Sequence, residues 1–167
     1  YNYILNHAEV KYVFSEGEEL LRKIEHILPT VPTLKGIYTF VDRGRHHYLS
    51  QLLEEGKANL DLEAIAKAKA EVTPEDVCCI IYTSGTTGQP KGVMHRHRNI
   101  VSQVMAAYDI PSDKCHRALS FLPMCHAYEK MLLYLYQYRG ISIYYAENMG
   151  TIVDNIKEVD PNIMTCV

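Results

Sequence analysis

The sequence has no tryptophan and no apolar run of transmembrane length. The most apolar stretch with helical character, residues 131–138, is short and rich in tyrosine, so it cannot span a bilayer. No signal-peptide pattern opens the chain either. The composition therefore predicts a soluble protein, and it leaves a peripheral membrane contact and a homo-oligomer open.

The chain also has no excess of positive charge. Its 17 lysines and arginines are outnumbered by 20 acidic residues, giving a net charge of -3. This balance argues against nucleic acid as a partner. The one strongly basic patch is residues 95–98, His-Arg-His-Arg, which either attracts a polyanionic ligand or forms a solvated helix entrance. The eight histidines lack carboxylate or cysteine partners at metal-binding spacing.

Several features that would divide or cross-link the chain are missing. There is no internal repeat and no long Gly/Ser linker, so residues 1–167 are expected to form a single domain or part of one. The five cysteines are an odd number in mostly apolar, strand-like runs, which predicts reduced, buried thiols and a cytoplasmic protein. Both ends of the sequence read as cut, which predicts that the domain is partial.

Short β-rich runs alternate with helix-like segments along the chain. This alternation predicts an α/β fold with a mainly parallel sheet flanked by helices. Apolar residues at helical spacing predict covering helices over 18–27 and 152–159, and 56–75 reads as an exposed surface helix. The expected strands cover residues 12–14, 36–41, 77–82, 118–121, 141–145 and 163–167.

The most informative stretch is residues 80–93, which reads as a buried strand running into a turn rich in hydroxyls and glycine. Its glycines permit backbone conformations that a side chain would forbid and allow an anion to approach the amides. Lys91 adds a mobile charge suited to the outer phosphates of a nucleotide, and Pro90 keeps the turn from closing directly into a helix. The candidate phosphate-binding residues are Thr83, Ser84, Gly85, Thr86, Thr87, Gly88 and Lys91.

This turn is not a Walker A loop. That motif requires a Gly-Lys pair followed by a serine or threonine that reaches magnesium, whereas Lys91 stands between Pro90 and Gly92. An ordinary surface turn also favours these residue types, but so long a combination of hydroxyls, glycines, proline and lysine is improbable by chance.

A second candidate segment, residues 119–129, follows the loop after one helix and one strand. In a parallel sheet the carboxyl ends of neighbouring strands share one crevice, which predicts that His126 approaches the ligand held by the loop. The alternative is that His126 caps the helix after Pro123, and the residues alone leave both open. Glu129 has no derivable role beyond a favourable negative charge in the first turn of a helix.

These residues carry a resemblance to a known family. Residues 82–94, followed by His97-Arg98-Asn99, resemble the AMP-binding signature of the adenylate-forming superfamily, which includes acyl-CoA synthetases, luciferases and peptide-synthetase adenylation domains. The Leu122-Pro123-x-x-His126-x-x-Glu129 segment and residues 140–147 resemble the long-chain fatty acyl-CoA synthetase branch in particular.

The resemblance implies a fold, substrates and residue roles. The chain would be the front, layered α/β part of the large domain, without the second sheet, the barrel and the C-terminal domain. ATP, a long-chain fatty acid and coenzyme A would be substrates and Mg²⁺ the metal. Thr83 to Gly88 would wrap the β- and γ-phosphates, Thr83 would also touch Mg²⁺, Lys91 would balance the departing pyrophosphate, and His126 would line the adenylate pocket.

Other readings stay open at this stage. The alternatives to a long-chain ligase are a shorter-chain acyl-CoA ligase, an adenylation domain that feeds a carrier protein, and a non-catalytic module that binds a nucleotide as a signal. Because the later acidic motif and the C-terminal lysine of the family lie outside the sequence, the 167 residues alone are expected to give no ATP–pyrophosphate exchange.

Overall fold

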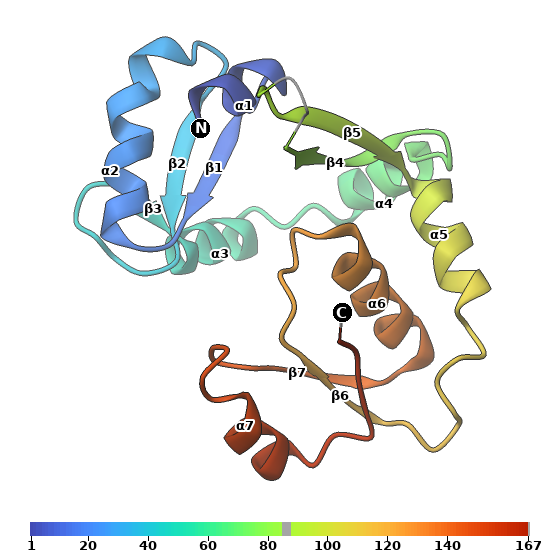
Figure 1. The fold of residues 1–167 in the computed structure, drawn as a ribbon. Coiled ribbons are helices and arrows are strands. Elements are labelled where there is room, and N and C mark those ends of the chain that lie inside the picture. The colour runs from blue at the N-terminus through green and yellow to red at the C-terminus, as the bar shows by residue number, and fades with distance from the viewer. Residues whose placement is uncertain (85–87, 167) are drawn as a thin grey trace. The chain divides into compact units, whose positions relative to one another are not determined.

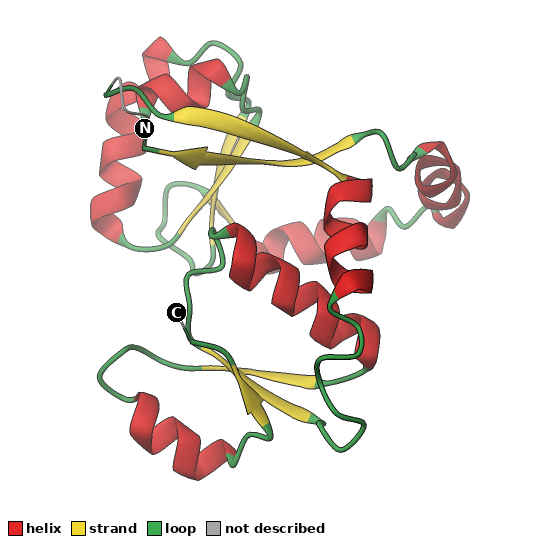
Figure 2. Cartoon of the chain, turned by 45° about the vertical axis from the view of Figure 1, so that its right-hand side comes forward, coloured by secondary structure: helices red, strands yellow, loops and turns green. Residues whose placement is uncertain are grey.

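The computed structural model describes residues 1–84 and 88–166 (Figures 1 and 2). Helices alternate with short strands, and the paired strands of both three-stranded sheets are parallel. This confirms the predicted α/β class. The chain divides into two compact units, Tyr1–Val72 with Tyr82–Gly92 and Thr73–Ile81 with Val93–Val167.

The first unit is built on the parallel sheet β1-β2-β3. In it, Tyr12 pairs with Gly36 and Tyr38 with His47. Its elements are α1 Asn2–His7, β1 Tyr12–Ser15, α2 Glu18–Ile27, the 3-10 turn η1 Leu28–Thr30, β2 Gly36–Thr39, β3 His47–Tyr48, α3 Leu49–Ala58 and α4 Leu62–Glu71.

Helix α2 has the predicted bounds and covers one face of this sheet. Leu21 and Ile24 are buried against Ile37 of β2, because apolar residues three and four positions apart lie on one face of a helix. Two glutamates in its first turn suit the positive end of the helix dipole. The outward-facing Tyr12 and Phe14 of β1 remain about half exposed.

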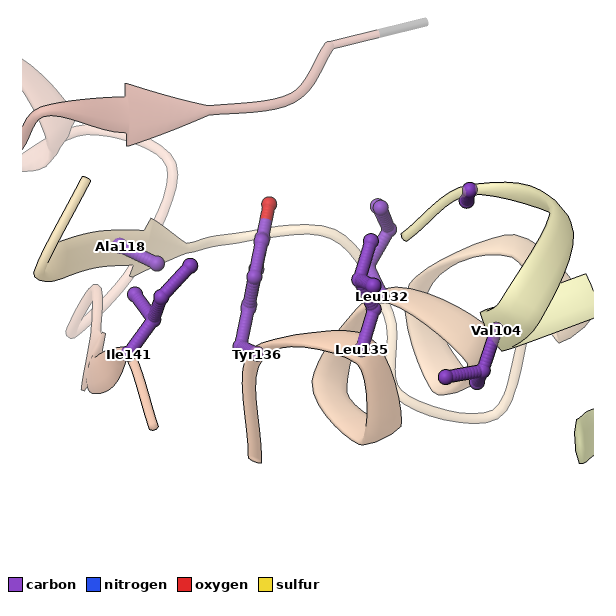
Figure 3. Close-up of a cluster of buried hydrophobic side chains, with 7 residues drawn as sticks. Val104, Ala118, Leu132, Leu135, Tyr136 and Ile141 are labelled. Atoms are coloured by element: carbon purple, nitrogen blue, oxygen red, sulfur yellow. The ribbon is translucent and has the colours of Figure 1, made fainter. Parts of the chain in front are cut away.

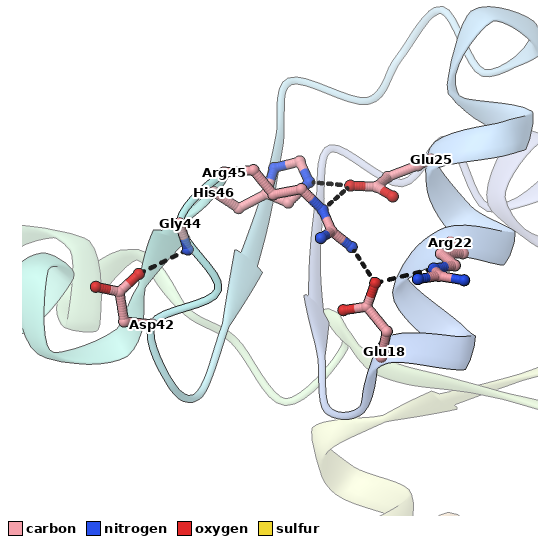
Figure 4. Close-up of polar contacts among 7 residues, drawn as sticks. All are labelled: Glu18, Arg22, Glu25, Asp42, Gly44, Arg45 and His46. Atoms are coloured by element: carbon pink, nitrogen blue, oxygen red, sulfur yellow. Dashed lines mark hydrogen bonds and ion pairs between the residues drawn. The ribbon is translucent and has the colours of Figure 1, made fainter.

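A polar cluster fastens the loop between β2 and β3 to α2 (Figure 4). Arg45 donates from Nε to Glu25 at 2.7 Å and from a terminal nitrogen to Glu18 at 2.8 Å. The ring nitrogen Nε2 of His46 lies 2.8 Å from the same Glu25 oxygen. The hydrogen bonds from His46 and Arg45 hold the pKa of Glu25 below its ordinary value.

The expected single helix over residues 56–75 is wrong. Two helices, α3 and α4, occupy residues 49–71 and are separated by residues 59–61. Helix α4 begins separately because of Asp61. The Asp61 carboxylate accepts a hydrogen bond from the backbone N–H of Ala64 at 2.9 Å and caps the helix. The exposure predicted for this region is confirmed, because α4 buries no residue.

The second unit is built on the parallel sheet β7-β6-β8, in which Ala118 of the central strand pairs with both Ile143 and Ile163. Its elements are α5 His97–Ala106, β6 Arg117–Ser120, α6 Ala127–Arg139, β7 Ser142–Tyr145, α7 Ile152–Val159 and β8 Ile163–Met164. The predicted helix over 152–159 and the predicted strands over 118–121 and 141–145 are thereby confirmed to within one residue, whereas the strand predicted over 163–167 is shorter and ends at Met164.

The core of this unit lies where α5 and α6 meet β6 (Figure 3). Its buried side chains are Val104, Ala107, Ala118, Leu132, Leu135, Tyr136 and Ile141. Gly140 ends α6 at φ 69°, a left-handed conformation that favours glycine. The following N–H of Ile141 then bonds back to the carbonyl of Tyr136 at 2.8 Å, which turns the chain into β7.

Strands β4 Val77–Thr83 and β5 Lys91–Arg96 form a two-stranded sheet of their own. Their connection, residues 84–90, is far too short for a parallel crossover, so the pair is a hairpin. The sequence predicted β4 but not β5. A strand rather than a helix therefore follows Pro90, which confirms that the loop does not open a helix.

The cysteine prediction needs correction. All five cysteines are free, as expected, but none is buried: Cys78, Cys125 and Cys166 are exposed and the other two are half-buried. Apolar neighbours in sequence predicted burial wrongly, because β4 buries no residue on either of its faces and Cys115, Cys125 and Cys166 lie outside the strands.

Candidate functional site

The candidate phosphate loop lies between the two strands of the hairpin. Thr83 is the last residue of β4 and Lys91 the first of β5, and the side chains of both are exposed at this end of the hairpin. Ser84 is also exposed. The predicted ligands Gly85, Thr86 and Thr87 lie outside the described residues.

Gly88 has the backbone conformation that the sequence predicts for the loop glycines. Its φ is 83°, in the left-handed region that residues with a side chain seldom adopt. A Cβ at this position would meet no atom of the described residues within 4 Å. The requirement for glycine is therefore conformational, and the open space beside it leaves the backbone accessible to a ligand.

A contact that sequence reasoning missed holds the strand just before the loop. The hydroxyl of Tyr82 lies 2.6 Å from Nδ1 of His7 in α1, and the two rings meet edge-on at 5.8 Å. His7 in turn stacks on Tyr3 at 5.3 Å. Helix α1 thus fixes the residue that precedes Thr83, and no local pattern indicates a partner 75 positions away.

The basic patch at residues 95–98 resolves into a local ion-pair cluster. Arg96 donates to one oxygen of Glu75 at 2.7 Å, and Arg98 pairs with the other oxygen. One carboxylate therefore accepts from both arginines of the patch. This geometry favours the solvated helix entrance over a site for a polyanion, since α5 begins at His97.

His126 occupies the N-cap position of α6, but its ring does not cap the helix. Its backbone accounts for the position: the N–H of His126 bonds to the carbonyl of Pro123 at 2.9 Å and its own carbonyl accepts from Lys130. No side-chain capping hydrogen bond forms. The capping alternative is thus not supported, and the exposed ring is available to a ligand.

A pocket of about 630 Å³ lies beside His126. Its wall is mostly apolar and includes one imidazole and one carboxylate; the lining residues are Leu122, Pro123, His126, Tyr128, Glu129 and Cys166. Ligand sites commonly have this size and this mixture of apolar wall and few polar groups.

Glu129 is the functional candidate whose environment the sequence did not reveal. It is in the first turn of α6 as expected, yet it is only 1% exposed. The hydroxyl of Ser120, at the end of β6, donates to its Oε1. Its Oε2 is buried and has no hydrogen-bond partner among the described residues. Burial of a carboxylate is costly, so this placement calls for an explanation.

The topology does not support the common crevice predicted for the loop and His126. Strand β4 pairs with β5, whereas β6 lies in the separate sheet β7-β6-β8, so the two are not neighbouring strands of one sheet. The approach of His126 to the ligand of the loop therefore stays a prediction.

The described loop residues Thr83 and Ser84 offer hydroxyls, not carboxylates, as donors for Mg²⁺. No cluster of three or more His, Cys, Asp or Glu side chains suited to a metal occurs within 1–84 and 88–166. Thr83 alone would be a poor site. It fits a Mg²⁺ ion whose remaining oxygens come from nucleotide phosphates and water, which is how this ion usually binds.

Comparison with known proteins identifies the family. A family model for AMP-binding enzymes matches residues 1–167. The chain belongs to this family. This confirms the resemblance drawn from the loop and from the segment around His126.

The relatives of this chain include long-chain-fatty-acid–CoA ligase 1 of Cavia porcellus. It is 31% identical, and the match covers 99% of the chain and 26% of the relative. The human long-chain-fatty-acid–CoA ligase 1 is 33% identical, and the match covers 99% of the chain and 26% of the relative. The chain therefore spans about a quarter of these relatives.

The fold is shared with solved structures of other enzymes. The luciferase-like enzyme of the mealworm Zophobas morio matches with a TM-score of 0.76 and 22% identity, over 98% of this chain and 37% of that one. FadD1 of Archaeoglobus fulgidus, a long-chain-fatty-acid–CoA ligase, matches with a TM-score of 0.72 and 23% identity. This match covers 96% of this chain and 30% of that one. Among the described residues, no helix has the length and apolarity to span a membrane.

Proposed function

We propose that the complete protein is an ATP-dependent long-chain fatty acid–CoA ligase. In the first step a fatty carboxylate oxygen attacks the α-phosphorus of ATP, and pyrophosphate leaves. In the second, the thiol sulfur of coenzyme A attacks the acyl carbonyl, AMP leaves and the thiol proton is released. The observation that carries this proposal is the match of the family model over residues 1–167, together with relatives named as long-chain ligases.

Each candidate residue has a role in this proposal. The hydroxyls and amides of Thr83 to Gly88 hold the β- and γ-phosphates, and Lys91 balances charge as pyrophosphate departs. Thr83 also contacts Mg²⁺, which would neutralise phosphate charge when bound. His126 lines the pocket of the acyl-adenylate. The exposed Thr83, Ser84 and Lys91 and the left-handed Gly88 support the role of the loop.

The activity can be tested in the complete protein by fatty-acid-dependent ATP–pyrophosphate exchange and by acyl-CoA formation. We expect exchange with long-chain fatty acids and less with short ones. Exchange that favours short acids would indicate a shorter-chain ligase, and adenylation without transfer to coenzyme A would indicate a domain that serves a carrier protein. ATP binding without exchange would indicate a non-catalytic module.

Lys91→Ala tests the role of the loop. We expect exchange to fall by about a hundredfold or more, the scale seen when one preorganised charge or donor is removed from a transition state. The fold should persist, because the Lys91 side chain is exposed. Lys67→Ala, at an exposed lysine of α4, is the matched control and should retain full exchange. An active Lys91→Ala enzyme would refute the role.

The location and partners follow from the proposed reaction. We propose a cytoplasmic enzyme whose partners are ATP, coenzyme A and a fatty acid, with no nucleic acid. A long apolar substrate gives such an enzyme a reason to contact a membrane surface peripherally, and homo-oligomer formation is a further proposal that size measurement on the complete protein tests.

A further inference from the structure

Glu129 is placed unlike an ordinary glutamate of a first helical turn. There a carboxylate usually stays solvated, where it suits the helix dipole, or bonds back to the N-cap backbone. Glu129 does neither. It is 1% exposed, and the N–H of His126 that a capping box would satisfy bonds instead to the carbonyl of Pro123.

Ser120 explains one oxygen of this carboxylate. Ser120 is itself 4% exposed and donates its hydroxyl hydrogen to Oε1, so the end of β6 is joined to the first turn of α6. The turn between these two points, residues 121–126, carries His126 at its end. The hydrogen bond therefore fixes both ends of the segment that presents the imidazole.

The other oxygen lacks such an explanation. Oε2 is buried and has no hydrogen-bond partner among the described residues, although unsatisfied buried oxygens are rare and costly. Glu129 lines the same pocket as His126, which precedes it by three residues at the same end of the helix. Residues at this spacing are neighbours, and a side chain at the third helical position can reach the N-cap residue.

We propose that Glu129 is a positioning residue for His126. Ser120 holds Oε1 and thereby aims Oε2 at the pocket, and the imidazole turns inward to donate its ring N–H to Oε2. The carboxylate then fixes the ring orientation and tautomer and favours the protonated ring, as a carboxylate behind a histidine does elsewhere. The proposed ligase reaction is the setting for this role, but the pairing itself does not depend on it.

The first test needs no activity. The rate at which diethyl pyrocarbonate modifies His126 is measured against pH in the complete protein, with the His126 peptide followed by mass spectrometry. In Glu129→Gln, whose amide oxygen can still accept from Ser120, we expect the midpoint to fall by roughly one pH unit, because the charge-assisted hydrogen bond is lost. Tyr128 and Cys166 line the same pocket, and Tyr136 lies close enough to Glu129 for the carboxylate to raise its pKa; no variant changes these groups.

The controls make this result specific. Glu158→Gln, at an exposed glutamate of α7, should leave the midpoint unchanged. Ser120→Ala should shift it in the same direction as Glu129→Gln but less, since the carboxylate remains and is only less well held. If Glu129→Gln does not fold, Ser120→Ala decides the matter. An unchanged midpoint in the folded variants overturns the proposal.

The second test is a double-mutant cycle on adenylate formation with His126→Gln and Glu129→Gln. We expect Glu129→Gln alone to slow the reaction about tenfold, the scale of one charge-assisted hydrogen bond, and to have little effect once His126 is replaced. Fully additive effects would refute action through His126. If the wild-type protein forms no adenylate, the proposed function fails, and the modification midpoint still decides the role of Glu129.

Discussion

At the scale of single residues, Gly88 is the loop position where the structure makes the strongest demand. Its φ of 83° is costly for any residue with a Cβ, although space for the methyl group is available. We expect Gly88→Ala to strain the loop by about 1–2 kcal/mol and to weaken ATP use. Urea unfolding and the KM for ATP of the complete protein measure both effects.

Gly56 is the matched control for this substitution. It lies inside α3, and a methyl group added to it would meet no atom within 4 Å, so Gly56→Ala should stabilise the helix by about 0.5–1 kcal/mol. Equal effects of the two alanines on stability and on KM would contradict the conformational reason for glycine at position 88.

Tyr136 lies in the core, and we expect its hydroxyl to contribute little to the stability of the fold. Its hydroxyl is buried and has no partner at hydrogen-bonding geometry among the described residues, although the side chain of Thr165 is near it, and burial raises the pKa of Tyr136, so the group stays protonated. We expect Tyr136→Phe to leave the melting temperature unchanged or slightly higher. Leu135→Ala, which creates a cavity in the same cluster, should lower the free energy of unfolding by about 2–5 kcal/mol. A clear loss of stability in Tyr136→Phe would reveal a hydrogen bond to its hydroxyl.

At the scale of elements, α4 depends on its cap because it buries nothing. Asp61→Ala should lower the stability of this helix by about 1 kcal/mol, whereas Asp61→Asn keeps a good N-cap and should be nearly neutral. Hydrogen exchange of the α4 amides measures the difference locally. Unchanged protection in Asp61→Ala would mean that the cap does not set the helix start.

The attachment of the β2–β3 loop to α2 should depend on pH. Because the folded pKa of Glu25 lies below its ordinary value of 4.5, the ionised carboxylate stabilises the folded state at pH above 4.5, and this contribution disappears as the pH falls through the folded pKa. Glu25→Gln should therefore reduce protection of α2 amides at neutral pH and matter progressively less in acid. Glu63→Gln, at an exposed residue of α4, should show no such trend.

The elements also show what the sequence could predict. Helices α2 and α7 were predicted to the residue, because their apolar positions repeat every three or four residues. Strand β5 was missed because its sequence, Lys-Gly-Val-Met-His-Arg, lacks strand alternation, and its partner β4 supplies the pairing. The contacts of His7 with Tyr82 and of Ser120 with Glu129 are tertiary, so no local pattern could indicate them.

At the scale of the whole molecule, the central prediction is that His126 and the loop serve one ligand. The local geometry supports each half: the loop presents exposed hydroxyls and Lys91, and the ring of His126 is free beside a pocket. Strand order gives no reason to join them, because β4 and β6 belong to different sheets. Joining them requires a measurement on the complete protein.

A photoreactive, non-hydrolysable analogue of the acyl-adenylate with an extended phosphate mimic provides that measurement. We expect it to label peptides from both 83–91 and 122–129, because one ligand would span the phosphate loop and the acyl pocket. Excess ATP with fatty acid should abolish both labels together, and Lys91→Ala should reduce both, since either peptide is reached only from the shared bound state. Labelling of one peptide that persists when the other is lost would show two separate sites.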